Sequence, residues 1–308
     1  MSAVFAWDQI TKHFGSQLAL SRFSLASEAG SVVALLGDNG AGKTTAIRIL
    51  LGLLEPTSGR SHVFGLDSQA NGQLIRQRVG YVPDRPALYE WMTIEQIGWF
   101  AAGFYPDGFY QRFCEYVGRF GLPIDKKIKT LSKGMRSKVS LALCMGHEPE
   151  LLVLDEPTSG LDPVVRREFL ESMVDVAAGG RTVLLSSHQI AEVERIADVI
   201  AIIRQGELLL VERLDKLKAE VREVTLTLSN GATALPEFGG TIISQHQRDR
   251  QWRVMLRGGE DSRLVALRDE GVLLEFEFRQ PTLEDIFVEV LKSTSARPPT
   301  LGQSSAHP

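Results

Sequence analysis

The sequence predicts an α/β fold in which a parallel sheet is covered by helices, with a helical subdomain inserted and a small α+β domain appended. Apolar β-like runs alternate with helical patterns from Val4 to about Arg204, which is typical of a parallel sheet with helical crossovers. Between Pro83 and Pro149, amphipathic stretches follow one another with no convincing strand between them. After Gly206, short strands with alternating polar and apolar residues appear. These changes of pattern define the expected core, the insertion and the second domain.

Four short apolar runs are the strongest strands of the expected core. Their length and their content of Val, Ile and Leu are typical of buried strands. They are Ser31–Leu36, Leu151–Asp155, Thr182–Ser186 and Val199–Ile203. The expected core domain comprises residues 1–221, and its helical subdomain comprises about residues 84–149. The amphipathic segments of that subdomain are Thr93–Phe104, Gly108–Phe120 and Lys133–Gly146.

The second domain is expected at residues 222–292. A hairpin at Gly206–Val211 and a charged helix at Leu214–Glu220 lead into it. Its expected strands are Glu223–Leu228, Trp252–Leu256 and Val272–Phe278, and its expected helices are Ser262–Glu270 and Thr282–Leu291. A dimer clamp, a regulatory ligand site and a cap on the sheet would share this pattern, so its role stays open. The tail at 293–308 is rich in Ser, Pro and Gly and is expected to be disordered.

Composition narrows the class of protein. The chain has 308 residues, 44% of them hydrophobic, which is enough for one large core and a small appended domain. A net charge of −4 gives no indication of a nucleic-acid partner. Cys114 and Cys144 lack a pairing or metal-binding pattern and are expected to be reduced thiols in a cytosolic protein. No apolar run approaches the roughly 20 residues that cross a bilayer, and no signal peptide is recognisable, so a membrane role would require a partner.

A glycine-rich segment, Gly37-Asp-Asn-Gly-Ala-Gly-Lys-Thr-Thr45, joins the strand Ser31–Leu36 to a helical stretch that ends near Leu51. Such a turn aims backbone N–H groups and the positive end of the helix dipole at one point, where a phosphate chain can bind. In the pattern G-x-x-x-x-G-K-[ST], Lys43 reaches the β- and γ-phosphates and the Thr44 hydroxyl ligates Mg²⁺. The other residues expected around the phosphates are Gly37, Asn39, Gly40, Ala41, Gly42 and Thr45. The segment therefore predicts a site for a nucleoside triphosphate.

Two adjacent carboxylates end the apolar strand Leu151–Asp155. At the end of a strand the backbone can turn both side chains toward a ligand bound at that edge of the sheet. Asp155 suits a Mg²⁺ ligand, while Glu156 suits a base that accepts a proton from an attacking water or orients it. A pair of solvated acids is the alternative, which the nearby phosphate-binding loop disfavours.

These motifs resemble those of the ATPase subunit of an ATP-binding cassette (ABC) transporter. Asp155-Glu-Pro-Thr-Ser-Gly-Leu-Asp162, Leu131-Ser-Lys-Gly-Met135 at the start of a helix, and His188 after the strand Thr182–Ser186 occur in the family's order and approximate spacing. The resemblance covers residue 4 to about residue 220. It implies the P-loop NTPase core of this family, with ATP and Mg²⁺ as nucleotide and metal.

The resemblance also implies a head-to-tail dimer in which each ATP is bound between two cassettes. The N-terminus of the signature helix offers free N–H groups and a positive dipole to a γ-phosphate. Ser132 and Gly134 match the family positions that touch this phosphate on the other subunit, and Asp162 matches a dimer contact beside the site. His188 matches the switch residue that contacts the γ-phosphate. Phe14 lies where the family has an aromatic that stacks on adenine, although an aromatic that packs a turn would look the same.

Two positions depart from the family pattern. After the strand-like Val79-Gly-Tyr-Val-Pro83, most members have a Gln that contacts Mg²⁺ and the attacking water, in the loop that faces the membrane subunit. Here Asp84 takes its place. Two alternatives stay open: its carboxylate binds the metal, or the negative charges of the phosphates and Glu156 repel it. The usual Leu-Ser-Gly-Gly-Gln signature has Lys133 and Met135 in place of a Gly and the Gln. The rest of the catalytic set is complete, so we expect an active ATPase.

The resemblance implies an ATP-hydrolysing subunit that drives a separately encoded integral membrane permease. The expected partners are that permease and a second ABC ATPase in a homodimer or heterodimer, without nucleic acid. The expected location is cytoplasmic, on the inner face of the membrane. The segment Pro281–Phe287 resembles the C-terminal domains of drug, lipid and polysaccharide exporter ATPases and so favours export. In this family the membrane subunit chooses the substrate.

Two other classes remain as alternatives. A soluble ATP-gated ABC clamp, as in DNA repair or translation, usually carries two cassettes, long coiled-coil or zinc insertions, or strongly basic arms, and this sequence has none of them. An unrelated P-loop kinase or GTPase would leave Leu131–Met135 and His188 unexplained.

Overall fold

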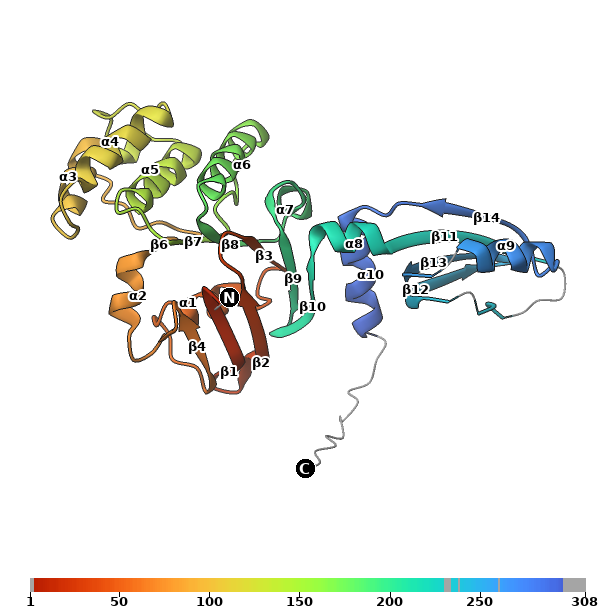
Figure 1. Ribbon diagram of the computed structural model, residues 1–308. Helices are drawn as coiled ribbons and strands as arrows, with labels where there is room; N and C mark the ends of the chain where they lie inside the picture. The colour runs from red at the N-terminus through yellow and green to blue at the C-terminus, as the bar shows by residue number, and fades with distance from the viewer. Residues whose placement is uncertain (1–2, 230–233, 238, 260, 296–308) are drawn as a thin grey trace. The chain divides into compact units, whose positions relative to one another are not determined.

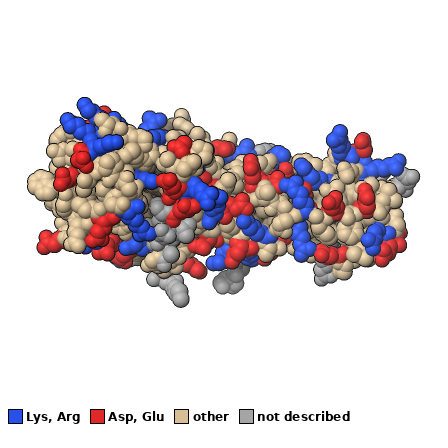
Figure 2. All heavy atoms as spheres, turned by 90° about the horizontal axis from the view of Figure 1, so that it is seen from above, with Lys and Arg blue, Asp and Glu red and all other residues tan. Residues whose placement is uncertain are grey.

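The computed structural model describes residues 3–229, 234–237, 239–259 and 261–295. Internal contacts divide the chain into two compact units, Met1–Val211 and Glu212–Pro308 (Figure 1). The division lies about ten residues before the expected boundary at 221, because helix α8 (Leu214–Glu220) packs on the first strand of the second unit. Charged side chains of both signs occur along the whole face shown in Figure 2.

The first unit is built around a six-stranded sheet with the order β10-β9-β3-β8-β7-β6. The pairs β6–β7, β7–β8, β8–β3 and β3–β9 are all parallel. Its strands are β3 (Val32–Leu36), β6 (Val79–Val82), β7 (Leu151–Asp155), β8 (Thr182–Ser187), β9 (Val199–Arg204) and β10 (Glu207–Arg213). Every residue of β3, β7 and β8 is buried, as predicted for a sheet covered on both faces.

The hairpin expected within Gly206–Val211 is instead made by β9 and β10, which lie next to each other in the sheet. Its turn is formed by Gln205 and Gly206, whose φ angles are 49° and 81°. A Cβ on Gly206 would lie 2.5 Å from the carbonyl oxygen of Ala19, so this turn requires glycine.

A second sheet, which the sequence did not separate from the first, is antiparallel and has the order β2-β1-β4-β5. Its strands are β1 (Phe5–Phe14), β2 (Gln17–Ser27), β4 (Ser58–Val63) and β5 (Leu66–Asp67). The expectation of one parallel core sheet is therefore wrong for this part of the chain. The physical reason is that β1 and β2 are joined only by Gly15 and Ser16, a connection too short for the crossover that parallel strands need.

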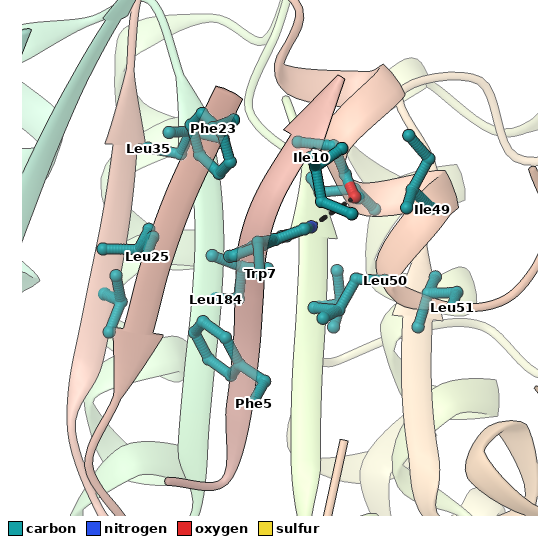
Figure 3. Packing of buried hydrophobic residues seen from close by; sticks show 14 of the residues in the cluster. Phe5, Trp7, Ile10, Phe23, Leu25, Leu35, Ile49, Leu50, Leu51 and Leu184 are labelled. Atoms are coloured by element: carbon teal, nitrogen blue, oxygen red, sulfur yellow. Dashed lines mark hydrogen bonds between the residues drawn. The ribbon is translucent and has the colours of Figure 1, made fainter. Parts of the chain in front are cut away.

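The antiparallel sheet packs on helix α1 (Lys43–Leu50) through aromatic side chains (Figure 3). The ring of Trp7 lies edge-on to the rings of Phe5 and Phe23, with centroid distances of 5.4 and 5.3 Å. Its indole Nε1 donates a hydrogen bond of 2.9 Å to the carbonyl oxygen of Ala46. This bond attaches the sheet to the helix that follows the phosphate-binding loop.

The inserted subdomain is helical, as predicted, and has a hydrophobic core of its own. Its helices are α3 (Ile94–Ala102), α4 (Phe109–Arg119), the 3₁₀ helix η1 (Ile128–Thr130) and α5 (Lys133–Met145). Thr93 begins α3 with a capping box, in which its hydroxyl accepts from the N–H of Gln96 and the Gln96 side chain accepts from the N–H of Thr93. The other helices of the first unit are α2 (Gly72–Arg78), α6 (Pro163–Ala178) and α7 (Ile190–Ile196).

In its described residues, the second unit has an antiparallel sheet with the order β12-β13-β11-β14 and, besides α8, two helices. Its elements are β11 (Val221–Leu228), β12 (Thr241–Arg248), β13 (Gln251–Arg257), α9 (Asp261–Asp269), β14 (Leu273–Arg279) and α10 (Leu283–Ser295). Strand β12 was not predicted because most of its residues are exposed and polar, so it lacks the apolar alternation of its neighbours. Helix α10 continues through the first three residues of the expected disordered tail, whose remainder, 296–308, lies outside the described residues.

Within the described ranges, no helix is both long enough and apolar enough to span a bilayer.

Candidate functional site

The phosphate-binding loop follows the buried strand β3 and leads into α1. Gly42 lies just before the helix, with φ 109°, where a Cβ would lie 2.7 Å from the carbonyl oxygen of Ala19. A Cβ on Gly37 would lie 2.3 Å from the carbonyl oxygen of Ile203. Strands β2 and β9 therefore approach the loop so closely that only glycine fits at these positions.

A cavity of about 500 Å³ opens over this loop. The predicted site residues that line it are Phe14, Asn39, Gly40, Ala41, Gly42, Lys43, Thr44, Thr45, Asp84 and Glu156. The Phe14 ring is 49% exposed at the end of β1, with Lys12 Nζ 5.1 Å from its centroid. A flat, accessible ring at the edge of a phosphate site has the geometry needed to stack on a base.

Four further residues line the cavity that the sequence did not single out: Gln17, Leu18, Ala19 and Gln205. The first three come from β2 of the antiparallel sheet, whose place beside the phosphate-binding loop had no local signal in the sequence. Gln205 did have a local signal in the sequence, because a Gln–Gly turn follows a strand there. That strand is parallel to β3, so the turn lies at the same edge of the sheet as the phosphate-binding loop.

Lys43 is the first residue of α1, directly after the loop, and is 5% exposed. Its Nζ donates to the carbonyl oxygens of Gly37 and Asp38, at 2.6 and 3.1 Å. The same nitrogen lies 2.9 Å from Oε1 of Glu156. The ammonium is thus held at the mouth of the loop by two carbonyls and a carboxylate, where a phosphate oxygen can also reach it.

Glu156 is held in an uncommon backbone conformation, with φ 50°. Its N–H lies 3.2 Å from the carbonyl oxygen and 3.0 Å from the hydroxyl of Ser186 on β8. Its Oε2 lies 2.7 Å from Nδ1 of His188. Lys43, Glu156 and His188 therefore lie together. They come from the segments that follow the neighbouring parallel strands β3, β7 and β8.

Asp155 is buried beside these residues. Burial raises the pKa of its carboxyl group, whereas hydrogen bonds from Ser186 and Thr44 act to lower it. Oδ1 accepts from the Ser186 hydroxyl at 2.6 Å, while Oδ2 has no hydrogen-bond partner of normal geometry in the described part of the chain. A buried carboxylate oxygen without a hydrogen-bond partner, on a residue that the Thr44 side chain also contacts, fits a divalent cation.

The protein ligands available to such a cation are few. Among the residues that the structure describes, no group of three His, Cys, Asp or Glu side chains forms a metal cage. Mg²⁺ commonly takes only one or two protein ligands and completes its shell with water and phosphate oxygens. Thr44 and Asp155 therefore suit Mg²⁺ bound together with a nucleotide better than a metal bound by protein alone.

Asp84 also lines the cavity, with its side chain 42% exposed. Its contact with Arg85 is loose, since Oδ2 of Asp84 lies 3.8 Å from Nε of Arg85. The negative charge of Asp84 contributes, as one of the smaller effects, to the raised pKa of Asp155. Asp84 is thus close enough to Asp155 to act on its carboxyl group electrostatically.

Ser132, Gly134 and Asp162 do not line this cavity. The Ser132 hydroxyl begins α5 by accepting from the N–H of Met135 at 3.2 Å. Asp162 Oδ1 likewise begins α6, accepting at 3.1 Å from the N–H groups of Val164 and Val165. A Cβ on Gly134 would lie 2.3 Å from Cγ1 of Val165, so the first turns of α5 and α6 are in close contact.

Comparisons with known proteins identify the family. A family model described as ABC transporter matches residues 20–159. The bacitracin transport ATP-binding protein BcrA of Bacillus licheniformis is 33% identical over 302 residues, which cover 94% of this chain and 98% of that protein. The daunorubicin resistance ATP-binding protein DrrA2 of Streptomyces coeruleorubidus is 34% identical over 304 residues, covering 92% and 93%.

A solved structure of the ATP-binding subunit of an ABC transporter matches with a TM-score of 0.63 and 31% identity, over 70% of this chain and 92% of that one. The predicted fold, an ABC-type P-loop core, is therefore confirmed. Both relatives are similar over nearly the whole chain. Lys43 and Glu156 line one cavity, and His188 contacts Glu156 from outside the cavity lining. The chain belongs to the ABC transporter family as an ATP-binding and ATP-hydrolysing subunit.

Proposed function

We propose that this chain powers an exporter by hydrolysing ATP in a head-to-tail dimer on a separately encoded permease, at the cytoplasmic face of the membrane. The observation that carries the catalytic part is the contact of Glu156 with both Lys43 and His188, at 2.9 and 2.7 Å. An ammonium at a phosphate-binding loop can bind the transferred phosphate, a carboxylate beside it can orient the attacking water, and an imidazole can hold that carboxylate in place.

Each of these residues has a distinct proposed role. Lys43 binds the β- and γ-phosphates and offsets the charge that develops during transfer. Glu156 accepts a proton from the attacking water or orients it. His188 holds the Glu156 carboxylate through its Nδ1 and contacts the γ-phosphate. Phe14 stacks on the adenine, and the backbone of residues 37–45 surrounds the phosphates.

Mg²⁺ would be held by the Thr44 hydroxyl and Asp155, where it would neutralise phosphate charge. The unpartnered Oδ2 of Asp155 supports this assignment. Asp84 is the third candidate ligand, at the exposed side of the cavity.

The dimer is proposed because one chain does not bring all the motif residues together. Ser132, Gly134 and Asp162 lie at the adjoining starts of α5 and α6, away from the cavity of their own chain. The free N–H groups at the start of α5 would bind the γ-phosphate held by a second cassette.

A surface of exposed aromatic side chains supports a permease partner. We call it the aromatic surface; it consists of Tyr89, Trp91, Trp99, Phe100 and Phe104. Trp99 and Phe104 are 73% and 72% exposed, and edge-on ring contacts join Tyr89 to Phe100 and Phe100 to Phe104. Ring contacts group Tyr89, Trp91, Phe100 and Phe104, and a group of exposed apolar side chains of this kind is typical of a protein interface.

A second apolar feature lies where the helical subdomain meets the sheet core. A cavity of about 270 Å³ there is lined by residues of both parts, including Tyr81, Tyr105 and His147. The Tyr105 ring stacks on His147 with a centroid distance of 4.7 Å. Together with the aromatic surface, this cavity offers the permease contacts on both parts of the cassette.

Export is proposed from the relatives, two of which are named for bacitracin transport and daunorubicin resistance. The similarity to them extends through the second unit, since it covers more than nine tenths of this chain.

A photo-crosslinking amino acid at Trp99 in cells tests the permease assignment, because it should attach the chain to a polytopic membrane protein. The matched control is the same amino acid at Leu53, which is 50% exposed and outside the aromatic surface. Crosslinking of membrane protein from both positions equally, or from neither, contradicts the docking site. An ATPase assay of the purified chain with and without Mg²⁺ tests the chemistry separately.

A further inference from the structure

Glu192 is a buried acid that the proposed chemistry does not use. It lies on α7 and is 4% exposed. Its Oε2 accepts from the Thr158 hydroxyl at 2.6 Å and from the Ser187 hydroxyl at 3.4 Å. Its Oε1 lies 3.1 Å from Nε of Arg166 on α6. Burial of a carboxylate is costly unless it is paired and hydrogen-bonded, and here two hydroxyls and a guanidinium group compensate for it.

Arg166 extends the pair to two loops. One terminal nitrogen donates to the carbonyl oxygen of Leu161 at 3.0 Å. The other donates to the side-chain oxygen of Gln189. The N–H of Gln189 in turn donates to the Ser187 hydroxyl at 2.9 Å. The guanidinium group therefore contacts the loop after β7 and the loop after β8 at the same time.

These two loops carry the residues of the reaction. The loop after β7 begins with Glu156 and ends with Asp162, and Thr158 and Leu161 lie between them. The loop after β8 carries His188 between Ser187 and Gln189. Since Glu156 and His188 belong to different loops, their distance of 2.7 Å depends on how the loops are held relative to each other.

We infer that Glu192 and Arg166 are positioning residues for ATP hydrolysis, which hold the His188 loop against the Glu156 loop. The inference rests on the roles proposed above for Glu156 and His188. Neither residue of the pair lines the nucleotide cavity, so neither should contribute to ATP binding. Their effect should fall on the catalytic step, because a small displacement of His188 from Glu156 removes an alignment that the transition state requires.

The main test is Glu192→Gln in the full chain, which keeps the side-chain volume and an acceptor for Thr158 but removes the charge opposite Arg166. We expect kcat to fall by about tenfold, as is common for partners one step removed from the reacting groups, with ATP affinity within about twofold of wild type. In a His188→Ala background, Glu192→Gln should produce almost no further loss in single-turnover rate, because its effect passes through His188. A merely structural pair would not give this non-additivity.

Glu168→Gln is the matched control. Glu168 lies on the same helix as Arg166, and its carboxylate pairs at 2.7 Å with Lys138 of α5 rather than with a residue of either loop. It should leave kcat unchanged. Thr158→Val, which removes one hydrogen bond to Glu192 and keeps the charges, is the second variant if Glu192→Gln does not fold, and it should lower kcat in the same non-additive way.

The outcomes separate this inference from the proposed function. Normal turnover by His188→Ala contradicts the role of His188 and this inference together. Reduced turnover by His188→Ala with unchanged turnover by both Glu192→Gln and Thr158→Val contradicts this inference alone. So does a further tenfold loss in the double variant, because the two effects would then be independent.

Discussion

The ammonium of Lys43 and the carboxylate of Glu156 form an ion pair of 2.9 Å, in which both side chains are almost completely buried. The residue proposed to bind phosphate is therefore paired with the proposed base. A γ-phosphate that approaches Lys43 must compete with this carboxylate, so that nucleotide binding and the placement of Glu156 are linked.

Glu156→Gln should abolish turnover while keeping or strengthening ATP binding. The amide cannot accept the proton of the attacking water, and it no longer competes as an anion for Lys43. We expect kcat to fall by at least about 100-fold, with a Kd for a fluorescent ATP analogue equal to or below that of wild type. Phosphate release and fluorescence titration measure the two quantities. Near wild-type hydrolysis would show that Glu156 is not the base.

Dimer formation should depend on ATP. Much of the proposed interface is the nucleotide itself, so ATP binding and association are thermodynamically linked. Light scattering of Glu156→Gln should show a dimer with ATP and Mg²⁺ and mostly monomer without them. Asp162→Asn, which can still cap α6, should weaken that dimer. A monomer under both conditions would contradict the sandwich, whereas a constant dimer would point to an interface made elsewhere in the chain.

Asp84→Gln should change the dependence of turnover on Mg²⁺ by several-fold. The carboxylate lines the cavity and adds negative charge near Asp155, which affects both metal affinity and the proton affinity of nearby acids. ATPase rates across a Mg²⁺ titration provide the measurement. Arg85→Gln is the control for the loose ion pair between these two residues. Identical titration curves for wild type and Asp84→Gln would mean that Asp84 does not act on the metal.

The second unit should lose stability in acid through Glu289, whose Oε2 lies 2.8 Å from Nε2 of His246. Burial alone would raise the pKa of Glu289, but hydrogen bonds from His246 and Lys292 outweigh it and lower the pKa to about 2, from 4.5. Because the folded pKa is depressed, the stabilisation is complete above about pH 4.5 and is lost as the pH falls from there toward 2.

Hydrogen exchange of the peptides spanning β12 and α10 in the full chain tests this expectation. Glu289→Gln should speed exchange at neutral pH, and its difference from wild type should shrink as the pH falls below about 4.5. Glu284→Gln, on the exposed side of the same helix, should show little difference at any pH. A difference for Glu289→Gln that does not change with pH would exclude this titration as its cause.

Truncation after Val211 should give a chain that binds ATP with unchanged affinity, because the residues that line the nucleotide cavity all precede it. Truncation after Val221 should give a less soluble product. It keeps α8 but removes most of β11, on which that helix packs, and so exposes the buried side chains of Leu214 and Leu217. Centrifugation and nucleotide titration compare the two. Equal solubility would contradict the division at 211, and loss of ATP binding by the shorter chain would contradict independent folding of the first unit.

The parts of the molecule that were predicted are those set by local sequence. The glycines before Lys43, the apolar run before Asp155 and the helix start at Leu131–Met135 each depend on their own residues, so a single segment is enough to recognise them. The antiparallel sheet was missed because its strands look locally like those of any sheet, and pairing is decided by which strands meet. Gln17 and Glu192 were missed for a related reason, since their partners are contributed by distant parts of the chain.

The helical subdomain has a hydrophobic core separate from that of the sheets, centred on side chains such as Phe109 and Phe113. Elements with separate cores can open separately, at a free-energy cost below that of global unfolding. Local opening of this subdomain would remove the start of α5 and the aromatic surface while leaving Lys43 in place. A chain with this subdomain locally unfolded would still bind ATP through the first unit. It would lack the proposed dimer and permease contacts, so the expected defect is bound ATP that is not hydrolysed.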